Sequence, residues 1–349
     1  MHVSTRGRAA AVAGALLLGL AGAPAASSAA TADVAGGATT LRLSSGTARA
    51  LNALGVAVTP LRPAKAGRSG VSFPVSGGSV NPATGAGTIE HRGGLRLRAG
   101  RTTVNLRNFV INAGSTNTIG VRVGNVRLHA FRIGLDDAKV RRSGVGTTVS
   151  GVKVTLSARG AAALSRAFKV TAFKRGLRIG TASARVRPGE LAFTGGSTSL
   201  ALDPGAAQAL TGLGVSVAPA APASAGDGGA IAFPITEGKV NARTLAGSIS
   251  HSGGLTFSAG ATSVTVSDFV IETAPAPKLT AELGGARVDL LTLDLSGLDR
   301  DAEGRDVTLG GVVVKLTAGA ATALNQAFGT TALTEGLTIG TATVRARVA

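Results

Sequence analysis

Residues 87–100 read GTIEHRGGLRLRAG, and residues 247–260 read GSISHSGGLTFSAG. Both segments alternate apolar and polar residues, as a β-strand with one buried face does, and both contain His-x-Gly-Gly-Leu. The same offset of 160 positions relates residues 71–111 to residues 231–271, with 20 identities in 41 positions. An internal repeat of this length indicates one structural unit that is present twice.

The repeat predicts two modules, at residues 39–190 and 197–349, joined by the segment PGELAFTGGS. Within each module, short alternating runs such as GVSFPV and NVRLHAFRIGL follow one another with brief connections. Two short segments per module carry Ala and Leu at helical spacing, among them SARGAAALSRAF. We therefore predict a mainly β (α+β) fold, an antiparallel β-rich module with two short helices, duplicated in tandem.

The first 30 residues have the pattern of a signal peptide. Arg6 and Arg8 precede the apolar run AAAVAGALLLGLAGA, and small residues suited to cleavage follow it. No later stretch is long enough to span a membrane, and the chain has no Cys. We therefore predict a secreted, extracellular protein without a transmembrane segment after cleavage, with association to the cell wall as a non-covalent option.

The histidine of the repeated segment precedes a glycine pair that predicts a hairpin turn, because glycine adopts positive φ without strain. Two interpretations of the histidine stay open at this point. It is either a structural side chain that caps a backbone group, or a pocket residue whose neighbouring glycines let a ligand approach the backbone. On the second interpretation, the candidate ligand-binding residues are His91, Gly93, Gly94, His251, Gly253 and Gly254.

Catalysis is not predicted. A histidine that acts as acid or base needs a partner, yet no carboxylate is kept between the two copies; Glu90, for example, corresponds to Ser250. The ionisable residues that keep their type are His91/His251, Arg127/Arg287, Arg185/Arg345 and Arg187/Arg347. One shared histidine per module is too few for a metal site, which takes three or four protein ligands. We expect a protein that is not an enzyme and has neither catalytic nor metal-ligating residues.

The segments GTIEHRGGLRL, VNLRNFVIN and GVRVGNVRLHAFRIGL resemble the Htaa domain of actinobacterial secreted and surface haem-uptake proteins. The resemblance covers most of each half and implies a β-rich module that binds haem. In that family a tyrosine near the start of the domain binds the iron and a histidine hydrogen-bonds to it, so that His91 and His251 would correspond to this histidine. This chain has no Tyr, which excludes tyrosinate ligation and leaves haem as a ligand implied by the family alone.

Charge separates the two copies. Residues 39–197 contain 25 Lys and Arg against 4 Asp and Glu, whereas residues 198–349 contain 9 against 13. Five arginines of the first module fall on the polar phase of alternating strands, and side chains two apart share a face. These candidate anion-binding residues are Arg96, Arg98, Arg107, Arg122 and Arg132, and their counterparts are Thr256, Ser258, Ser267, Glu282 and Thr292. The pattern predicts a basic sheet surface, which is either a solvated face or a contact for an anionic partner.

Two functions remain open on these observations. The first is a non-catalytic tandem binding protein of the Htaa type, with haem as its ligand. The alternative is a cell-envelope structural or adhesion protein without a small ligand, held by its basic module to an anionic wall polymer or a membrane surface. Nucleic acid is not expected as a partner, because the chain has no Trp or Tyr to stack on bases and carries an export signal.

Overall fold

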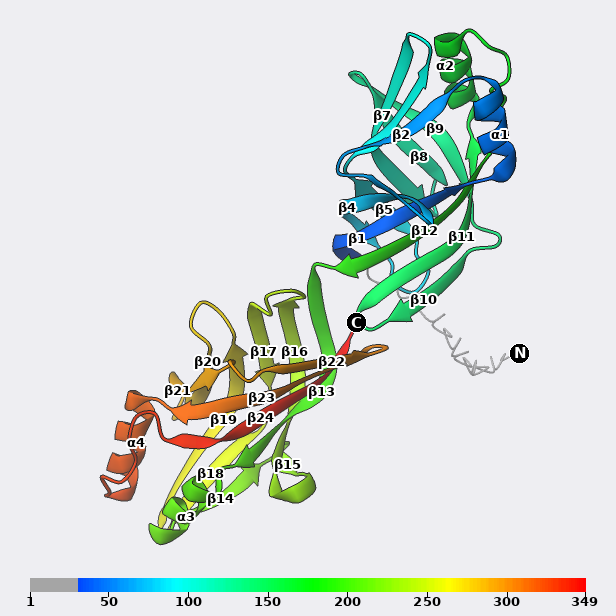
Figure 1. Cartoon of the computed structure of the whole chain (residues 1–349). Helices are drawn as coiled ribbons and strands as arrows, with labels where there is room; N and C mark the ends of the chain where they lie inside the picture. The colour runs from blue at the N-terminus through cyan, green and yellow to red at the C-terminus, as the bar shows by residue number, and fades with distance from the viewer. Residues whose placement is uncertain (1–30) are drawn as a thin grey trace, which may run out of the picture.

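The computed structural model describes residues 31–349, so the signal peptide predicted at 1–30 lies outside the described residues. Figure 1 shows two bodies placed end to end, each built around a curved sheet. The strands of the first sheet are β1 (Ala32–Leu43), β2 (Ala57–Leu61), β3 (Lys65–Gly67), β4 (Gly70–Val80), β5 (Gly87–His91), β6 (Gly94–Ala99), β7 (Thr102–Ala113), β8 (Thr118–Val123), β9 (Val126–Gly134), β10 (Lys139–Ser143), β11 (Gly146–Leu156) and β12 (Arg178–Pro188). Its helices are α1 (Ser45–Ala53) and α2 (Ala158–Phe168).

The second sheet repeats this order. Its strands are β13 (Glu190–Leu202), β14 (Ser216–Ala220), β15 (Ser224–Ala225), β16 (Ile231–Asn241), β17 (Gly247–His251), β18 (Gly254–Ala259), β19 (Thr262–Glu272), β20 (Lys278–Leu283), β21 (Ala286–Asp294), β22 (Asp299–Glu303), β23 (Asp306–Leu316) and β24 (Thr338–Val348). Its helices are α3 (Pro204–Gly212), the single 3₁₀ turn η1 (Asp227–Gly229) and α4 (Ala318–Phe328). The fold is mainly β with antiparallel pairing, as the alternating runs predict.

Each sheet closes on itself. In the first, the order β7-β5-β4-β1-β12-β11-β9-β8 returns to β7 through an additional β7–β8 pairing, which makes an eight-stranded antiparallel barrel. In the second, β19–β20 pairing closes the equivalent ring. Strand β6 pairs with β7 in line with β5, and β2 pairs with β6; β18 and β14 are placed in the same way beside β19. Closure removes most of the unpaired edges that an open sheet would expose.

The helices begin where a side chain satisfies their first amide groups. Ser44 accepts a hydrogen bond from the Thr47 amide at the start of α1, and Asp203 accepts from two amides at the start of α3. The helix α1 ends just before Gly55, whose φ of 64° suits a helix stop, as the sequence indicates. The helices lie at the ends of the barrels (Figure 1).

Alternation places one face of each strand inside its barrel. On β6, Leu95 and Leu97 are buried while Arg96 and Arg98 are exposed. Two core clusters result. The first contains buried residues from Val34 to Val186 and the second contains those from Leu191 to Ala346.

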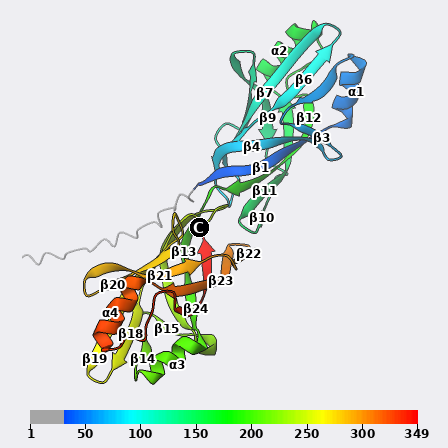
Figure 2. The ribbon, with the colours of Figure 1, turned by 60° about the vertical axis from the view of Figure 1, so that its left-hand side comes forward.

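The connection between the two sheets is shorter than the sequence indicates. Residues 188–197, predicted to be a linker, belong to β12 and β13 apart from Gly189, and the first sheet begins at Ala32 rather than at residue 39. Figure 2 shows the same end-to-end order from another side. The Gly189 amide donates to the Asp33 carbonyl and the Gly189 carbonyl accepts from the Ala242 amide, so this residue is hydrogen-bonded to both sheets.

Candidate functional site

The histidine segment does not form the predicted hairpin. Strand β5 pairs with residues 110–113 of β7 and β6 pairs with residues 102–107 of the same strand. Strands β5 and β6 therefore run in line beside β7, and residues 92–93 form a bend between them rather than a turn. The second module has the same arrangement of β17 and β18 beside β19. The prediction was wrong because two glycines suit a bend within a strand as well as a turn.

The two histidines lie inside the barrels. His91 is 4% exposed and His251 is 5% exposed, each at the end of its strand. The Nδ1 atom of His91 lies 3.0 Å from the Phe109 carbonyl oxygen, and its Nε2 atom lies 2.7 Å from the Thr39 hydroxyl. Both ring nitrogens are therefore satisfied within the protein.

These contacts fix the tautomer of the histidine. A carbonyl oxygen accepts hydrogen bonds only, so Nδ1 carries the proton and donates, while Nε2 accepts from the threonine hydroxyl. His251 repeats the arrangement, with Phe269 O at 3.2 Å and Thr198 Oγ1 at 2.6 Å. Desolvation by burial lowers the pKa of each histidine from 6.5 to about 4, although the backbone hydrogen bond acts in the opposite direction. Both rings are neutral at pH 7.

The glycines beside the histidine are required by the packing of the protein's own backbone. A Cβ atom on Gly93 (φ +86°) would lie 2.6 Å from the Ala64 amide nitrogen and 2.8 Å from the Leu61 carbonyl oxygen. A Cβ atom on Gly94 would lie 2.1 Å from the Leu106 carbonyl oxygen. Gly253 and Gly254 meet equivalent atoms in the second module. The space that the sequence suggested for a ligand is thus filled by neighbouring main chain.

Each histidine lines a cavity in the interior of its barrel. The cavity beside His91 measures about 60 Å³ and α1 contributes nothing to its lining. The cavity beside His251 measures about 120 Å³ and is lined by apolar side chains together with Thr198 and Thr273. Neither cavity approaches the roughly 300–1,000 Å³ of pockets that enclose drug-sized molecules.

Haem does not fit the residues that are present. The side chains that commonly bind haem iron are those of His, Cys, Met and Tyr. The chain has no Cys or Tyr, and the described residues contain no Met. His91 and His251 are buried with both nitrogens engaged, and the remaining described histidine, His129, is exposed on β9 outside both cavities. Ligation by either buried histidine would require breaking its bond to the threonine and enlarging its cavity several-fold.

No group of three or more His, Cys, Asp or Glu residues that could hold a metal ion occurs in residues 31–349. Within the same residues, no helix has the length and apolar character needed to cross a bilayer.

The five arginines singled out in the sequence lie on β6, β7, β8 and β9. All five predicted residues are exposed: Arg96, Arg98, Arg107, Arg122 and Arg132. Arg107 lies opposite Arg122, and Arg122 lies opposite Arg127, so that three arginines stand in register across three strands. Arg127 is one of the residues kept in both copies, but the strand pattern alone did not place it with this set.

The arginines form an elongated band rather than a compact patch. In strand register, Arg98 lies opposite Thr103 of β7, and Arg132 lies opposite Thr118 of β8, which in turn pairs with Asn112 of β7. From Thr103 to Asn112 is about 30 Å at 3.3 Å per residue. We call Arg96, Arg98, Arg107, Arg122, Arg127 and Arg132 the arginine band.

Few acidic groups balance the arginine band. Residues 87–134 contain eight arginines and one acidic residue, Glu90. No ion pair involves any of these residues; every ion pair between described residues joins residues 190–349. The band is held by a few neutral contacts, such as that of Arg96 Nε with Asn105 Oδ1 at 3.2 Å.

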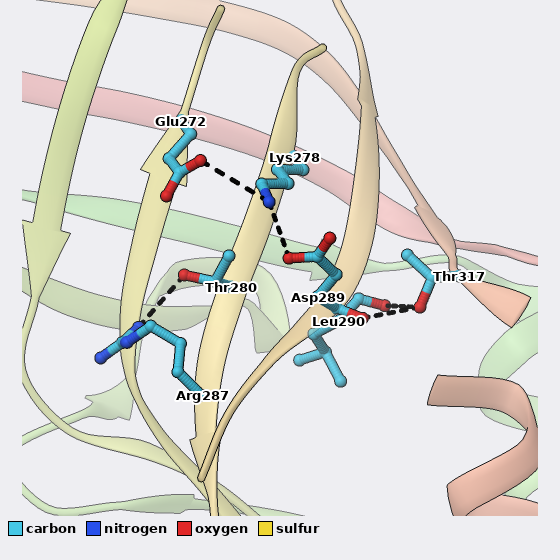
Figure 3. A network of polar contacts seen from close by, with 7 residues as sticks. All are labelled: Glu272, Lys278, Thr280, Arg287, Asp289, Leu290 and Thr317. Atoms are coloured by element: carbon cyan, nitrogen blue, oxygen red, sulfur yellow. Dashed lines mark hydrogen bonds and ion pairs between the residues drawn. The ribbon is translucent and has the colours of Figure 1, made fainter. Parts of the chain in front are cut away.

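On the corresponding strands of the second module, the basic side chains contact acidic and neutral polar groups of the same module, and Figure 3 shows part of this network. Lys278 lies 2.8 Å from Asp289 and 3.8 Å from Glu272, and the hydrogen bond to Asp289 raises the pKa of Lys278. Arg287, the counterpart of Arg127, donates to the Asp268 carbonyl and to Thr280. Its cross-strand neighbour is Glu282, where the first module has Arg122. Fold and strand register are shared, so the difference between the two faces lies in their side chains.

Among known proteins, some solved structures are similar to this chain in their fold. No family model and no curated protein matches the chain. The C-terminal domain of HtaA from Corynebacterium glutamicum is similar in structure, with a TM-score of 0.36, 19% identity, and coverage of 46% of this chain and 99% of that one. The haem-binding protein HtaB from the same organism has a TM-score of 0.29, 11% identity, and coverage of 46% of this chain and 96% of that one.

Proposed function

We propose that the chain is a non-catalytic binding protein whose first module attaches to an extended anionic partner outside the cell through the arginine band. The observation that carries this proposal is the difference between the twin faces. The second module pairs its charges with one another, whereas the first presents arginines in register with no acidic partner. Like charges placed side by side on adjacent strands cost stability unless counterions or a ligand compensate them.

The length of the band favours a polymer over a small anion. Six guanidinium groups distributed along about 30 Å match a chain of repeating negative charges, which would contact them in succession. Binding of this kind releases the counterions that surround the polymer and is therefore strongly dependent on salt. The lack of Trp and Tyr favours phosphate or carboxylate groups over stacked sugar rings.

The sequence pattern of residues 1–30 favours a partner outside the cell. The sequence of residues 1–30 has the charged, apolar and small-residue regions of a signal peptide, and the chain contains no cysteine that could carry a lipid. Attachment to an anionic wall polymer would rest on the charges of the arginine band. Haem as a ligand, which the Htaa resemblance implies, gains no support from the donor groups of the described residues.

The experiment is a binding titration of the full chain with a teichoic acid, a polymer linked by phosphodiesters. We expect Arg107→Ser with Arg122→Ser to weaken binding at least tenfold at low salt. The matched control is Arg159→Ser with Arg166→Ser on α2, which removes the same charge from exposed positions outside the band. Equal weakening by both pairs would show that net charge alone attracts the polymer, and no binding by the wild type would overturn the proposal.

A further inference from the structure

The interiors of the two barrels differ although their folds agree. The cavity in the second module measures about 120 Å³ and that in the first about 60 Å³. Two substitutions between the copies each remove an aromatic ring from the interior of the second module. Phe131 in the first module corresponds to Leu291 in the second, and Phe173 corresponds to Leu333. All four side chains are buried.

The aromatic rings fill the first barrel. Phe131 stacks on Phe109 with ring centroids 6.4 Å apart, and Phe173 packs against Phe168 at 6.1 Å. The second module keeps Phe269 and Phe328 at the equivalent positions but has leucines as their partners, and both Leu291 and Leu333 line its cavity. Well-packed cores contain few voids larger than a water molecule, so a void of this size leaves contacts unmade.

The wall of the second cavity offers a ligand no free polar group. Thr198 and His251 are hydrogen-bonded to each other, and the Thr273 hydroxyl donates to backbone carbonyls at Leu245 and Gly247. The other lining side chains are hydrocarbon. Water needs two to four polar partners to occupy a cavity, so an apolar cavity stays dry. An engineered cavity of about 150 Å³ lined by Leu, Ile and Phe is dry and binds benzene or xenon.

We propose that the interior of the second module is a binding site for one small, uncharged apolar molecule of about the size of benzene. The first module, with its barrel filled by Phe131 and Phe173, lacks such a site. Helix α3 is the natural point of entry, because it contributes Ala206 and Leu210 to the wall and Ala206 is its only fully buried residue. An element with so few buried side chains opens at low cost in free energy.

The test uses the full chain and benzene as the probe, with binding followed by methyl NMR spectra and by calorimetry. We expect saturable binding of one benzene per chain, with shifts confined to methyl groups of the second barrel such as those of Leu291, Val314 and Leu316. Absence of saturable binding, or shifts that are equal in both barrels, would overturn the proposal.

Variants that exchange twin residues identify the site. Leu291→Phe should weaken benzene binding at least tenfold, since the first module shows that a phenyl ring is accommodated at this position. Leu333→Phe fills a different part of the cavity and serves the same purpose if Leu291→Phe does not fold. Conversely, Phe131→Leu should create a second, weaker site in the first barrel. Undiminished binding in a folded filling variant would place the benzene elsewhere and refute the proposal.

Discussion

The ring of His91 links β5 to β1, because its Nε2 atom accepts a hydrogen bond from the hydroxyl of Thr39, which lies 52 positions earlier in the sequence. The pair is buried, with Thr39 at 5% exposure and His91 at 4%. Thr198 and His251 form the same pair in the second module. Burial with both ring nitrogens engaged favours the first of the two interpretations that the sequence left open, and we propose that the histidine of both copies is a structural residue of the barrel interior.

Removal of the threonine hydroxyl should therefore destabilise the barrel. We expect Thr39→Val or Thr198→Val to lower the free energy of unfolding by about 1–3 kcal/mol, because the shape is kept while a buried ring nitrogen loses its donor. Urea unfolding of the full chain at pH 7 measures the change. Thr40→Val is the control, since its side chain lies on the opposite face of β1. If Thr40→Val lowers the free energy of unfolding as much as Thr39→Val does, the buried pair does not stabilise the barrel.

The histidines should make stability depend on pH. The folded-state pKa of about 4 lies below the unfolded value of 6.5, so the unfolded chain binds more protons between these pH values. Stability is then fully present above pH 6.5 and is lost as pH falls toward 4, by about 3 kcal/mol for each histidine. Chemical unfolding at pH 7 and pH 4.5 measures the loss. The double variant His91→Gln, His251→Gln should lose distinctly less over this range; an identical loss would assign the pH dependence to carboxylates.

The bend glycines should tolerate no side chain. We expect Gly93→Ala to cost about 2–4 kcal/mol, from its positive φ together with the clash with the Ala64 amide. Gly100→Ala is the matched control. Gly100 has a φ of +55°, and a Cβ atom at this position would have no neighbour within 4 Å, so the substitution should cost only about 1 kcal/mol. Thermal unfolding measures the loss of stability in both variants. Equal losses would mean that the backbone around residue 93 moves to accept a Cβ atom without cost.

Haem added to the full chain should give no spectrum of a histidine-bound iron. Both candidate nitrogens are engaged in hydrogen bonds inside cavities of about 60 and 120 Å³. Absorption and resonance Raman spectra of haem mixed with the wild type should match those obtained with His91→Ala, His251→Ala. A ligation signature present in the wild type and absent from the double variant would refute the structural role assigned to these residues.

Arginines placed in register on the second module, as Arg107, Arg122 and Arg127 are on the first, should give it affinity for the same polymer. Ser267→Arg with Glu282→Arg would add two arginines in register with Arg287 and so give a row of three, as in the first module. We expect teichoic acid binding to strengthen at least threefold at low salt, with the gain lost at high salt through screening. Thr331→Arg with Glu335→Arg adds the same charge at exposed positions away from that face. An equal gain from this control pair would mean that placement in register is unimportant.

The sequence by itself determined the class of the fold and the difference in charge. The alternation of Leu95, Arg96, Leu97 and Arg98 fixes which side chains are buried, because successive residues of a strand point to opposite faces. The same reasoning placed the arginines outside. The repeat showed that one fold accommodates both a basic and a mildly acidic surface, since its apolar positions are kept while its charges change.

Only the tertiary structure decided what the shared histidine and glycines do. The partners of His91 are Thr39 and Phe109, 52 and 18 positions away, and they meet it because β1, β5 and β7 converge in one closed barrel. The bend at Gly93 likewise depends on Leu61 and Ala64 lying against it, and the register of Arg107, Arg122 and Arg127 depends on strand pairing. The alternation of residues along a strand specifies which face a side chain occupies. Contacts between distant segments depend on how the strands pair when the sheet closes, and the sequence of one segment does not specify that pairing.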